Sequence, residues 1–346
     1  MRKILILLML LTFFSCSKKE PSIAWEKSTI FSEILASVGD GYVMIDFVKD
    51  GSSWCAQLDA ETFTNLEVIN YVNKNLTAVK MNADSSAVKE LIEHYKISGF
   101  PTILIVNADS TEIDRIIGYL PPESFLNEIQ RIQRGENTIA DYIKKTTENP
   151  NDFNLWKALA GKYEDRGDLS SEIEVWESVA EVSIGDQMLV KYKIVELRAQ
   201  IDQDVSGLEE FVTNNLDSEF TPYAFRNIIN IQRRKKDVEA EVRTWINLIH
   251  YLELKKIQTA AFYNSFAWRM SEVDKKLDLA LEKIRTGINM LAENDSTNLA
   301  GFMDTEAEIL WKMGNIDEAI KVIDKSITLQ PDDKYFQDQK EKFLEN

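Results

Sequence analysis

Apolar positions along residues 23–133 alternate between the two periods that distinguish helices from strands. Residues 23–38 carry apolar side chains at helical spacing, and residues 42–48 form a nearly continuous apolar run, which is typical of a buried strand. The alternation then continues, and we expect further helices and strands over residues 55–75 (helix), 76–81 (strand), 86–95 (helix), 101–106 and 112–117 (a hairpin of strands) and 122–133 (helix). This order predicts an α/β domain whose central sheet is covered by helices on both faces.

The pattern changes after residue 136. Residues 135–138 interrupt the helix that closes the first domain, and beyond Pro150 the apolar spacing is helical without a convincing strand. Five of the seven tryptophans fall in this second part, where we expect most of them to be core residues. The sequence therefore predicts a second, all-α domain.

The second part contains a repeated helix–turn–helix pattern. In residues 300–331, Ala307 and Ala319 allow two helices to touch, Gly314 turns the chain and Pro331 stops the second helix. This unit resembles a tetratricopeptide repeat. Looser matches cover residues 153–184, 222–253 and 262–292. Because such units cannot bury their apolar faces singly, we expect them to stack into a solenoid with a groove that suits a protein or peptide partner.

The first sixteen residues have the layout of an export signal. Arg2 and Lys3 precede an apolar run that is too short for a permanent membrane span, and Ser15 and Cys16 follow it. A small residue directly before a cysteine resembles a bacterial lipobox, which implies cleavage before Cys16 and acylation of that residue. The alternative is an ordinary secretory signal with an incidental cysteine. Residues 17–22 are interpreted as a tether, and Ser17 directly after Cys16 resembles the sorting pattern of lipoproteins in the outer membrane, which implies an anchor there that faces the periplasm.

Charge and cysteine content exclude several kinds of site. The chain has a formal net charge of -17 over 346 residues, which argues against a nucleic-acid partner, and we interpret the basic residues 233–236 as a solvated helix end. His94 and His250 lie in different predicted domains, so we expect no metal site, and no glycine-rich phosphate loop or other cofactor motif occurs. With Cys16 acylated, Cys55 is the one remaining thiol and cannot form an internal disulfide.

Several spaced features of the first domain resemble the thioredoxin family. A strand containing Asp46 is followed six residues later by the segment Ser52-Ser53-Trp54-Cys55, where the family has Cys-x-x-Cys at a helix start. The loop Gly99-Phe100-Pro101-Thr102 matches the family loop with a cis proline, and Gly118 matches a late glycine. The fold class expected from the whole sequence is an α/β thioredoxin-like domain followed by an all-α tetratricopeptide-like solenoid.

The resemblance implies roles for individual residues. Ser52 replaces the attacking cysteine, Cys55 occupies the resolving position and Asp46 corresponds to the acid that handles its proton, while Trp54, Phe100 and a cis Pro101 flank a peptide-binding surface. Each residue also has a structural interpretation. Ser52 is suited to an N-cap, Cys55 to a small buried apolar position, Asp46 to a hydrogen-bonded core carboxylate, and Trp54 and Phe100 to covering the helix end.

These observations define an expected organisation of the chain. We expect a lipoprotein signal peptide over residues 1–16, a tether over 17–22, a thioredoxin-like domain over 23–136 and a helical-repeat domain over 137–346. The expected function is protein binding or scaffolding in the cell envelope without dithiol turnover, with membrane attachment through the lipid. The alternative is a monothiol thiol-disulfide oxidoreductase that uses Cys55 with a partner thiol.

Overall fold

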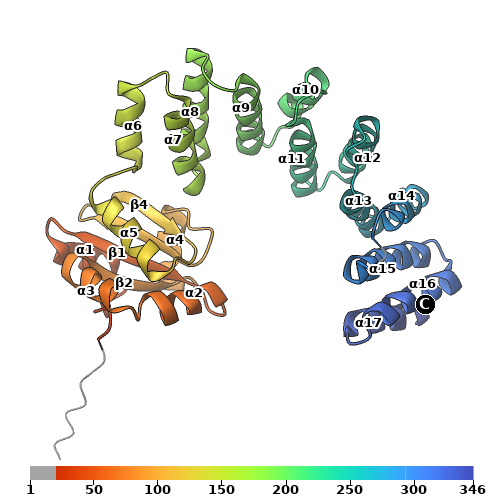
Figure 1. Cartoon of the computed structure of the whole chain (residues 1–346), viewed down its shortest axis with the longest axis horizontal. Helices are drawn as coiled ribbons and strands as arrows, with labels where there is room; N and C mark the ends of the chain where they lie inside the picture. Colours follow the sequence, from red (N-terminus) through yellow and green to blue (C-terminus); the bar gives the residue numbers. More distant parts are fainter. Residues whose placement is uncertain (1–20, 293, 346) are drawn as a thin grey trace, which may run out of the picture. The chain divides into compact units, whose positions relative to one another are not determined.

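The computed structural model describes residues 21–292 and 294–345, which form two compact units (Figure 1). The first unit ends at Val175 and the second begins at Trp176, and each is described by itself. The predicted signal peptide, the lipidation site Cys16 and most of the predicted tether lie outside the described residues. Within the described ranges, no helix combines the length and the apolar character needed to cross a bilayer.

The first unit is built on a four-stranded sheet with the order β2-β1-β3-β4. Its strands are β1 (Tyr42–Val48), β2 (Thr77–Asn82), β3 (Thr102–Asn107) and β4 (Glu112–Ile117). β1 runs parallel to β2 and antiparallel to β3, and β3 and β4 form the expected antiparallel hairpin. The five central residues of β1 are buried, as its continuous apolar pattern predicted.

Helices cover both faces of this sheet, which confirms the predicted α/β architecture. On one face, apolar residues of α3 (Leu66–Asn75) and α5 (Pro122–Gln133) pack on Met44, Ile103 and Ile105. On the other face, α1 (Phe31–Val38) and α4 (Lys89–His94) pack on Phe47 and its neighbours. A 3-10 turn, η2 (Ser86–Val88), leads into α4.

The predicted first helix is shorter than its periodicity suggested. It begins at Phe31, and the segment before it is extended, with a parallel bridge between Trp25 and Ala78 of β2. The backbone N–H of Glu26 donates to the carbonyl of Ala78 at 2.7 Å, and the N–H of Ala24 donates to Asn73 Oδ1 at 2.7 Å. These contacts with distant residues satisfy the backbone without a helix.

The expected single helix over residues 55–75 is wrong, because the chain forms three helical pieces. These are α2 (Ser53–Gln57), the π-helical turn η1 (Leu58–Thr62) and α3. Asn65 begins α3 as its N-cap, since its side chain accepts the backbone N–H groups of Glu67 and Val68 at 2.9 and 3.3 Å. The hydroxyl of Thr62 donates to the carbonyl of Leu120 at 2.6 Å and holds the break in place.

Helices after the sheet domain are joined to its edge strand β4 by ion pairs. The first unit includes α6 (Ile139–Glu148), α7 (Phe153–Asp165) and the start of α8 (Leu169–Val182). Lys162 Nζ and Arg131 Nη2 lie 2.7 and 2.9 Å from Asp114 Oδ2, and Arg166 Nε lies 2.7 Å from Glu112 Oε1. Asp114 is buried, so these contacts fix α7 beside β4 rather than leaving it on a loose linker.

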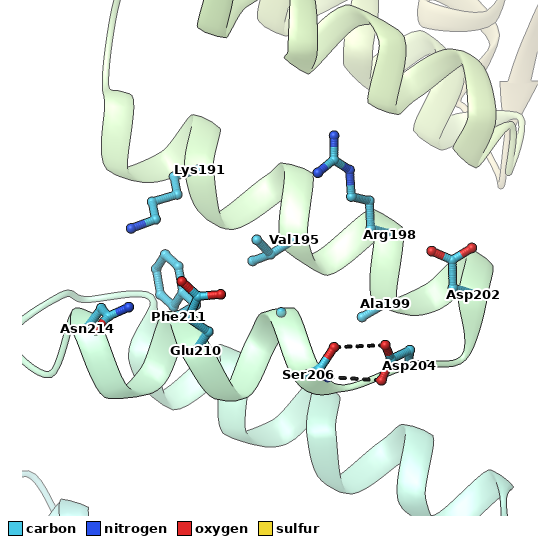
Figure 2. Close-up of a pocket in the computed structure, with 11 residues that line it drawn as sticks. Lys191, Val195, Arg198, Ala199, Asp202, Asp204, Ser206, Glu210, Phe211 and Asn214 are labelled. Atoms are coloured by element: carbon cyan, nitrogen blue, oxygen red, sulfur yellow. Dashed lines mark hydrogen bonds between the residues drawn. The ribbon is translucent and has the colours of Figure 1, made fainter.

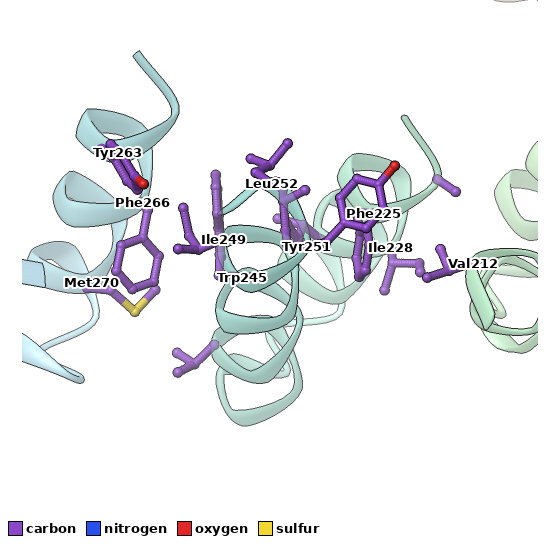
Figure 3. Packing of buried hydrophobic residues seen from close by; sticks show 14 of the residues in the cluster. Val212, Phe225, Ile228, Trp245, Ile249, Tyr251, Leu252, Tyr263, Phe266 and Met270 are labelled. Atoms are coloured by element: carbon purple, nitrogen blue, oxygen red, sulfur yellow. The ribbon is translucent and has the colours of Figure 1, made fainter. Parts of the chain in front are cut away.

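The second unit consists of successive helix pairs, which confirms the predicted tetratricopeptide-like solenoid. Its further helices are α9 (Gln187–Asp202), α10 (Ser206–Asn214), α11 (Thr221–Arg234), α12 (Val238–Lys255), α13 (Ala260–Glu272), α14 (Leu277–Asn289), α15 (Ser296–Lys312), α16 (Ile316–Leu329) and α17 (Lys334–Leu344). Trp245 and Phe266 pack in one continuous apolar core that joins several pairs (Figure 3). The α9–α10 pair was not anticipated from the sequence.

Candidate functional site

The Ser-x-x-Cys segment forms the turn after β1 and the start of α2. Ser52 has an extended backbone, and its Oγ accepts the backbone N–H of Cys55 at 3.3 Å. Ser52 is thus the N-cap of the helix, which is the structural interpretation of this residue. Cys55, the one cysteine of residues 21–292 and 294–345, is 6% exposed. The helix start therefore presents a hydroxyl engaged in capping and a thiol that is largely covered.

Asp46 lies fully buried in β1 and pairs with a lysine of the next strand. In the parallel register Asp46 is opposite Lys80, and Lys80 Nζ lies 2.9 Å from Asp46 Oδ2. Lys80 also donates to Asp59, which follows α2. Asp46 Oδ1 has no hydrogen-bond donor among the described residues. One cation therefore serves a buried and an exposed carboxylate.

Burial determines the protonation behaviour of this pair. Loss of hydration raises the pKa of Asp46 to about 6, because it outweighs the attraction of Lys80. Burial would lower the pKa of Lys80, yet the pKa is raised because two carboxylates surround the ammonium group. Lys80 keeps 28% of its side chain exposed, so its desolvation is less complete than that of Asp46. Asp46 can consequently take up a proton under mildly acidic conditions.

Trp54 is the exposed aromatic residue of the site. It is 57% exposed and stacks on Tyr119, with ring centroids 6.2 Å apart and an interplanar angle of 25°. The Tyr119 hydroxyl donates to Glu61 of η1, and this hydrogen bond raises the pKa of the phenol. Trp54 is therefore held against the loop between β4 and α5 while one face remains available for contact.

The Gly-Phe-Pro-Thr loop lies at the start of β3. The Phe100–Pro101 peptide bond is cis, and the carbonyl of Pro101 accepts the N–H of Gly118 at 2.8 Å. The hydroxyl of Thr102 donates to the carbonyl of Gly99 at 2.8 Å. Phe100 is half-buried against the apolar cluster that contains Phe47, so it and Trp54 are held by different neighbours.

Two contributors to the site were not identified in the sequence, Lys80 and Tyr119. Lys80 is the one charged residue of the β-rich stretch Thr77–Asn82, and pairing that stretch with β1 would have indicated its place beside Asp46. Tyr119 directly follows Gly118, which was recognised, but no periodicity connects it with Trp54.

Two observations elsewhere in the described chain bear on metals and small ligands. Within the described ranges, no cluster of three or more His, Cys, Asp or Glu side chains is arranged to hold a metal ion. A hollow of about 330 Å³ between α9 and α10 combines Lys191 and Arg198 with Asp202, Asp204 and Glu210 (Figure 2). Its charges have mixed sign, and the hydroxyl of Ser206 donates to Asp204 at 2.8 Å.

Comparison with known proteins places the first domain in a defined class. The sequence model of the thioredoxin-like domain matches residues 34–133. The thiol:disulfide interchange protein DsbD of Haemophilus ducreyi is 28% identical over 118 residues, which cover 32% of this chain and 21% of that protein. DsbD of Pasteurella multocida is 25% identical over 29% of this chain and 18% of its own length. The match thus spans about a fifth of these relatives.

Solved structures resemble the two parts of the chain separately. The C-terminal domain of Neisseria meningitidis DsbD in the oxidised form is 18% identical, with a TM-score of 0.28 over 32% of this chain and 98% of that one. YrrB, described as a TPR protein with an unusual peptide-binding site, is 13% identical, with a TM-score of 0.40 over 58% and 97%. With the topology above, residues 34–133 form a thioredoxin-like domain, and tetratricopeptide-like repeats follow it.

Proposed function

We propose that this chain is a lipid-anchored protein of the bacterial cell envelope that binds polypeptides and does not itself turn over dithiols. The helical repeats provide the main contact with a partner. The thioredoxin-like domain adds a weaker contact through Trp54, Phe100 and the edge beside Pro101. Two linked weak sites reinforce each other when both engage one partner.

The main support for this proposal is that position 52 holds a serine whose oxygen accepts a hydrogen bond from Cys55. Dithiol exchange requires a thiolate that attacks a disulfide and a second thiol that resolves the mixed species. Ser52 occupies the attacking position, and its oxygen is engaged with the N–H of Cys55. A hydroxyl is a far weaker nucleophile than a thiolate at neutral pH, so the domain retains the surface around Cys55 without the attacking group.

Monothiol exchange is the second candidate. The relatives named above are thiol:disulfide interchange proteins, and Asp46 combines complete burial with a pKa raised to about 6. In this candidate Cys55 attacks the disulfide of a partner, and an external thiol releases the product. The low exposure of Cys55 favours the binding function instead, because attack requires access to the sulfur.

Capture of partners from envelope extract distinguishes the two functions. We expect the tagged wild-type protein and Cys55→Ser to retain the same partners, and added dithiothreitol to leave them bound, because the contacts are non-covalent. Trp54→Ala is expected to weaken capture by several-fold, since it removes an exposed aromatic anchor. Quantitative mass spectrometry of the eluted proteins measures both effects.

An exposed residue away from the site provides the control for this capture. Leu66 is 57% exposed in α3, the same exposed fraction as Trp54, so Leu66→Ala removes exposed apolar surface of the same domain outside the site and outside the helical repeats. Capture should be unaffected by this change if Trp54 has a specific role. Loss of the partners with Cys55→Ser or with dithiothreitol would instead favour monothiol exchange.

The lipid anchor is tested separately at Cys16. We expect mass spectrometry of the mature wild-type protein to find an acylated Cys16 at the N-terminus, and the protein to sediment with membranes. Cys16→Ala should abolish the modification and release the protein, whereas Ser17→Ala should keep both modification and sedimentation. A fully soluble wild-type protein with an unmodified residue 16 would contradict the anchor.

A further inference from the structure

A hollow of about 510 Å³ lies between α11, α12 and α13 of the second unit. Arg226, Asn230 and Arg233 line it from successive turns of α11, and all three are exposed. Phe262 and Trp268 of α13 line it as well and are half-buried. The hollow therefore combines cationic and amide donors with aromatic surface.

A buried carboxylate fixes two arginines of this hollow. Arg269 donates from Nε and Nη2 to the two oxygens of Glu241, each at 2.7 Å, and Arg233 Nε donates to Glu241 Oε1 at 3.0 Å. Burial would raise the pKa of Glu241, but the hydrogen bonds from Arg269 and Arg233 lower it, so the group stays ionised. The two guanidinium groups are thus held in place before any partner binds.

Donors outnumber acceptors around the hollow. Within residues 21–292 and 294–345, the side chain of Arg226 has neither an ion-pair nor a hydrogen-bond partner, and an arginine side chain offers five N–H donors and no acceptor. Trp245 also lines the hollow and is 8% exposed, and its indole N–H lacks an acceptor in the same part of the chain. A buried donor without an acceptor is unfavourable, so an incoming acceptor stabilises the site.

We propose that this hollow binds an acidic side chain of a polypeptide partner, with an adjacent aromatic residue of the partner packed against Phe262 and Trp268. The Arg226 guanidinium and the free N–H groups of Arg233 receive the carboxylate. This inference rests on the proposed polypeptide-binding function and specifies the sequence that the repeats select.

Charge complementarity supports this occupant. Three arginines of the cluster, Arg226, Arg233 and Arg269, face two carboxylates, Glu241 and Glu272, so the cluster carries an excess positive charge within a chain of net charge -17. The hollow between α9 and α10 has the opposite balance, with two basic and three acidic side chains. An acidic segment is therefore attracted to the first hollow and repelled by the second.

Selection from a random peptide library displayed on phage tests the proposal with the whole protein. We expect bound peptides to be enriched in Asp or Glu next to an aromatic residue. Synthetic copies of the selected peptides should bind Arg226→Ala about tenfold more weakly than they bind the wild type. Peptides in which Asn or Gln replaces the acidic residue should bind the wild type more weakly by a similar factor. Fluorescence anisotropy at low and high salt measures these affinities, and binding should weaken with salt.

Arg234→Ala is the matched control, because Arg234 is adjacent to Arg233 but does not line the hollow and contacts Gln203 instead. It should leave the affinity unchanged. Selected peptides without enrichment in Asp or Glu, or equal affinity of these peptides for the wild type and Arg226→Ala, would overturn the acidic subsite. Either result would leave the proposed polypeptide binding intact. Absence of any binding peptide would overturn both. A phosphoserine version that binds more than about tenfold tighter than the acidic peptide would reassign the site to phosphopeptides.

Discussion

Replacing Ser52 with Cys is expected to give the start of α2 a working dithiol. The variant Ser52→Cys places a second sulfur three residues before Cys55 at the N-terminus of α2, where the backbone N–H groups favour a thiolate. The new thiolate attacks a substrate disulfide, and Cys55 then displaces the reduced substrate and closes an internal disulfide. We expect insulin reduction with dithiothreitol to rise above that of the wild type by about a hundredfold, since the wild type has a hydroxyl at position 52 in place of a thiol.

The thiol count provides an independent measurement of this change. In a Cys16→Ala background, oxidised Ser52→Cys should contain no free thiol after denaturation, whereas the parent retains the single thiol of Cys55. Ser53→Cys is the matched control, because it adds a thiol next to the correct position with the wrong spacing. Insulin reduction by the wild type at the rate of the variant would refute the absence of dithiol turnover. Failure of Ser52→Cys to oxidise would question the placement of position 52.

The strands and helices of the sheet could be predicted from local signals, and the site residues from the resemblance to the thioredoxin family. The apolar run over Tyr42–Val48 identified β1, and the resemblance to the thioredoxin family placed Ser52, six residues after Asp46, at the start of a helix. The β4 strand and α5 have the bounds that the sequence predicted. These elements follow from patterns that a short window contains.

Features that depend on distant contacts could not be predicted in the same way. The segment around Trp25 has helical spacing, but its backbone bonds to β2, so tertiary pairing overrides the local pattern. The partnership of Asp46 with Lys80 requires the strand order, and the stack of Trp54 on Tyr119 joins residues far apart in sequence. The break before α3 did have a local signal, since Asn65 is a favourable N-cap.

The cluster of Arg233, Arg269 and Glu241 shows what a local interpretation of the sequence can miss. Residues 233–236 were expected to be a solvated helix end, and α11 does end at Arg234. Arg233 nevertheless reaches Glu241 of α12, which also binds Arg269 of α13. The relevant chemistry depends on three helices meeting, so no charge run in the sequence reveals it.

The variant Asp46→Asn is expected to stabilise the thioredoxin-like domain at neutral pH. The pKa of Asp46 is about 6 in the folded chain and near 3.8 when unfolded, so the folded state binds the proton more tightly. The contribution of protonated Asp46 to the free energy of unfolding is therefore fully present below about pH 4. It is lost as the pH rises through about 6. An amide avoids the buried charge, and Lys80 keeps Asp59 as a partner. We expect a gain of about 2 kcal/mol in the free energy of unfolding at pH 7.5.

Hydrogen exchange of amides in β1 and β3, followed by mass spectrometry, measures this gain inside the two-unit chain. At a given pH the intrinsic exchange rate is the same for the variant and the wild type, so it cancels when their measured rates are divided. We expect exchange to slow by about thirtyfold at pH 7.5, because about 1.4 kcal/mol corresponds to a factor of ten, and to change little at pH 4. Asp40 is an exposed carboxylate of the same domain, so Asp40→Asn should exchange at the wild-type rate at both pH 7.5 and pH 4. Faster exchange in Asp46→Asn at pH 7.5 would mean that the ion pair with Lys80 outweighs the desolvation of Asp46, and the buried acid would then be a stabilising group.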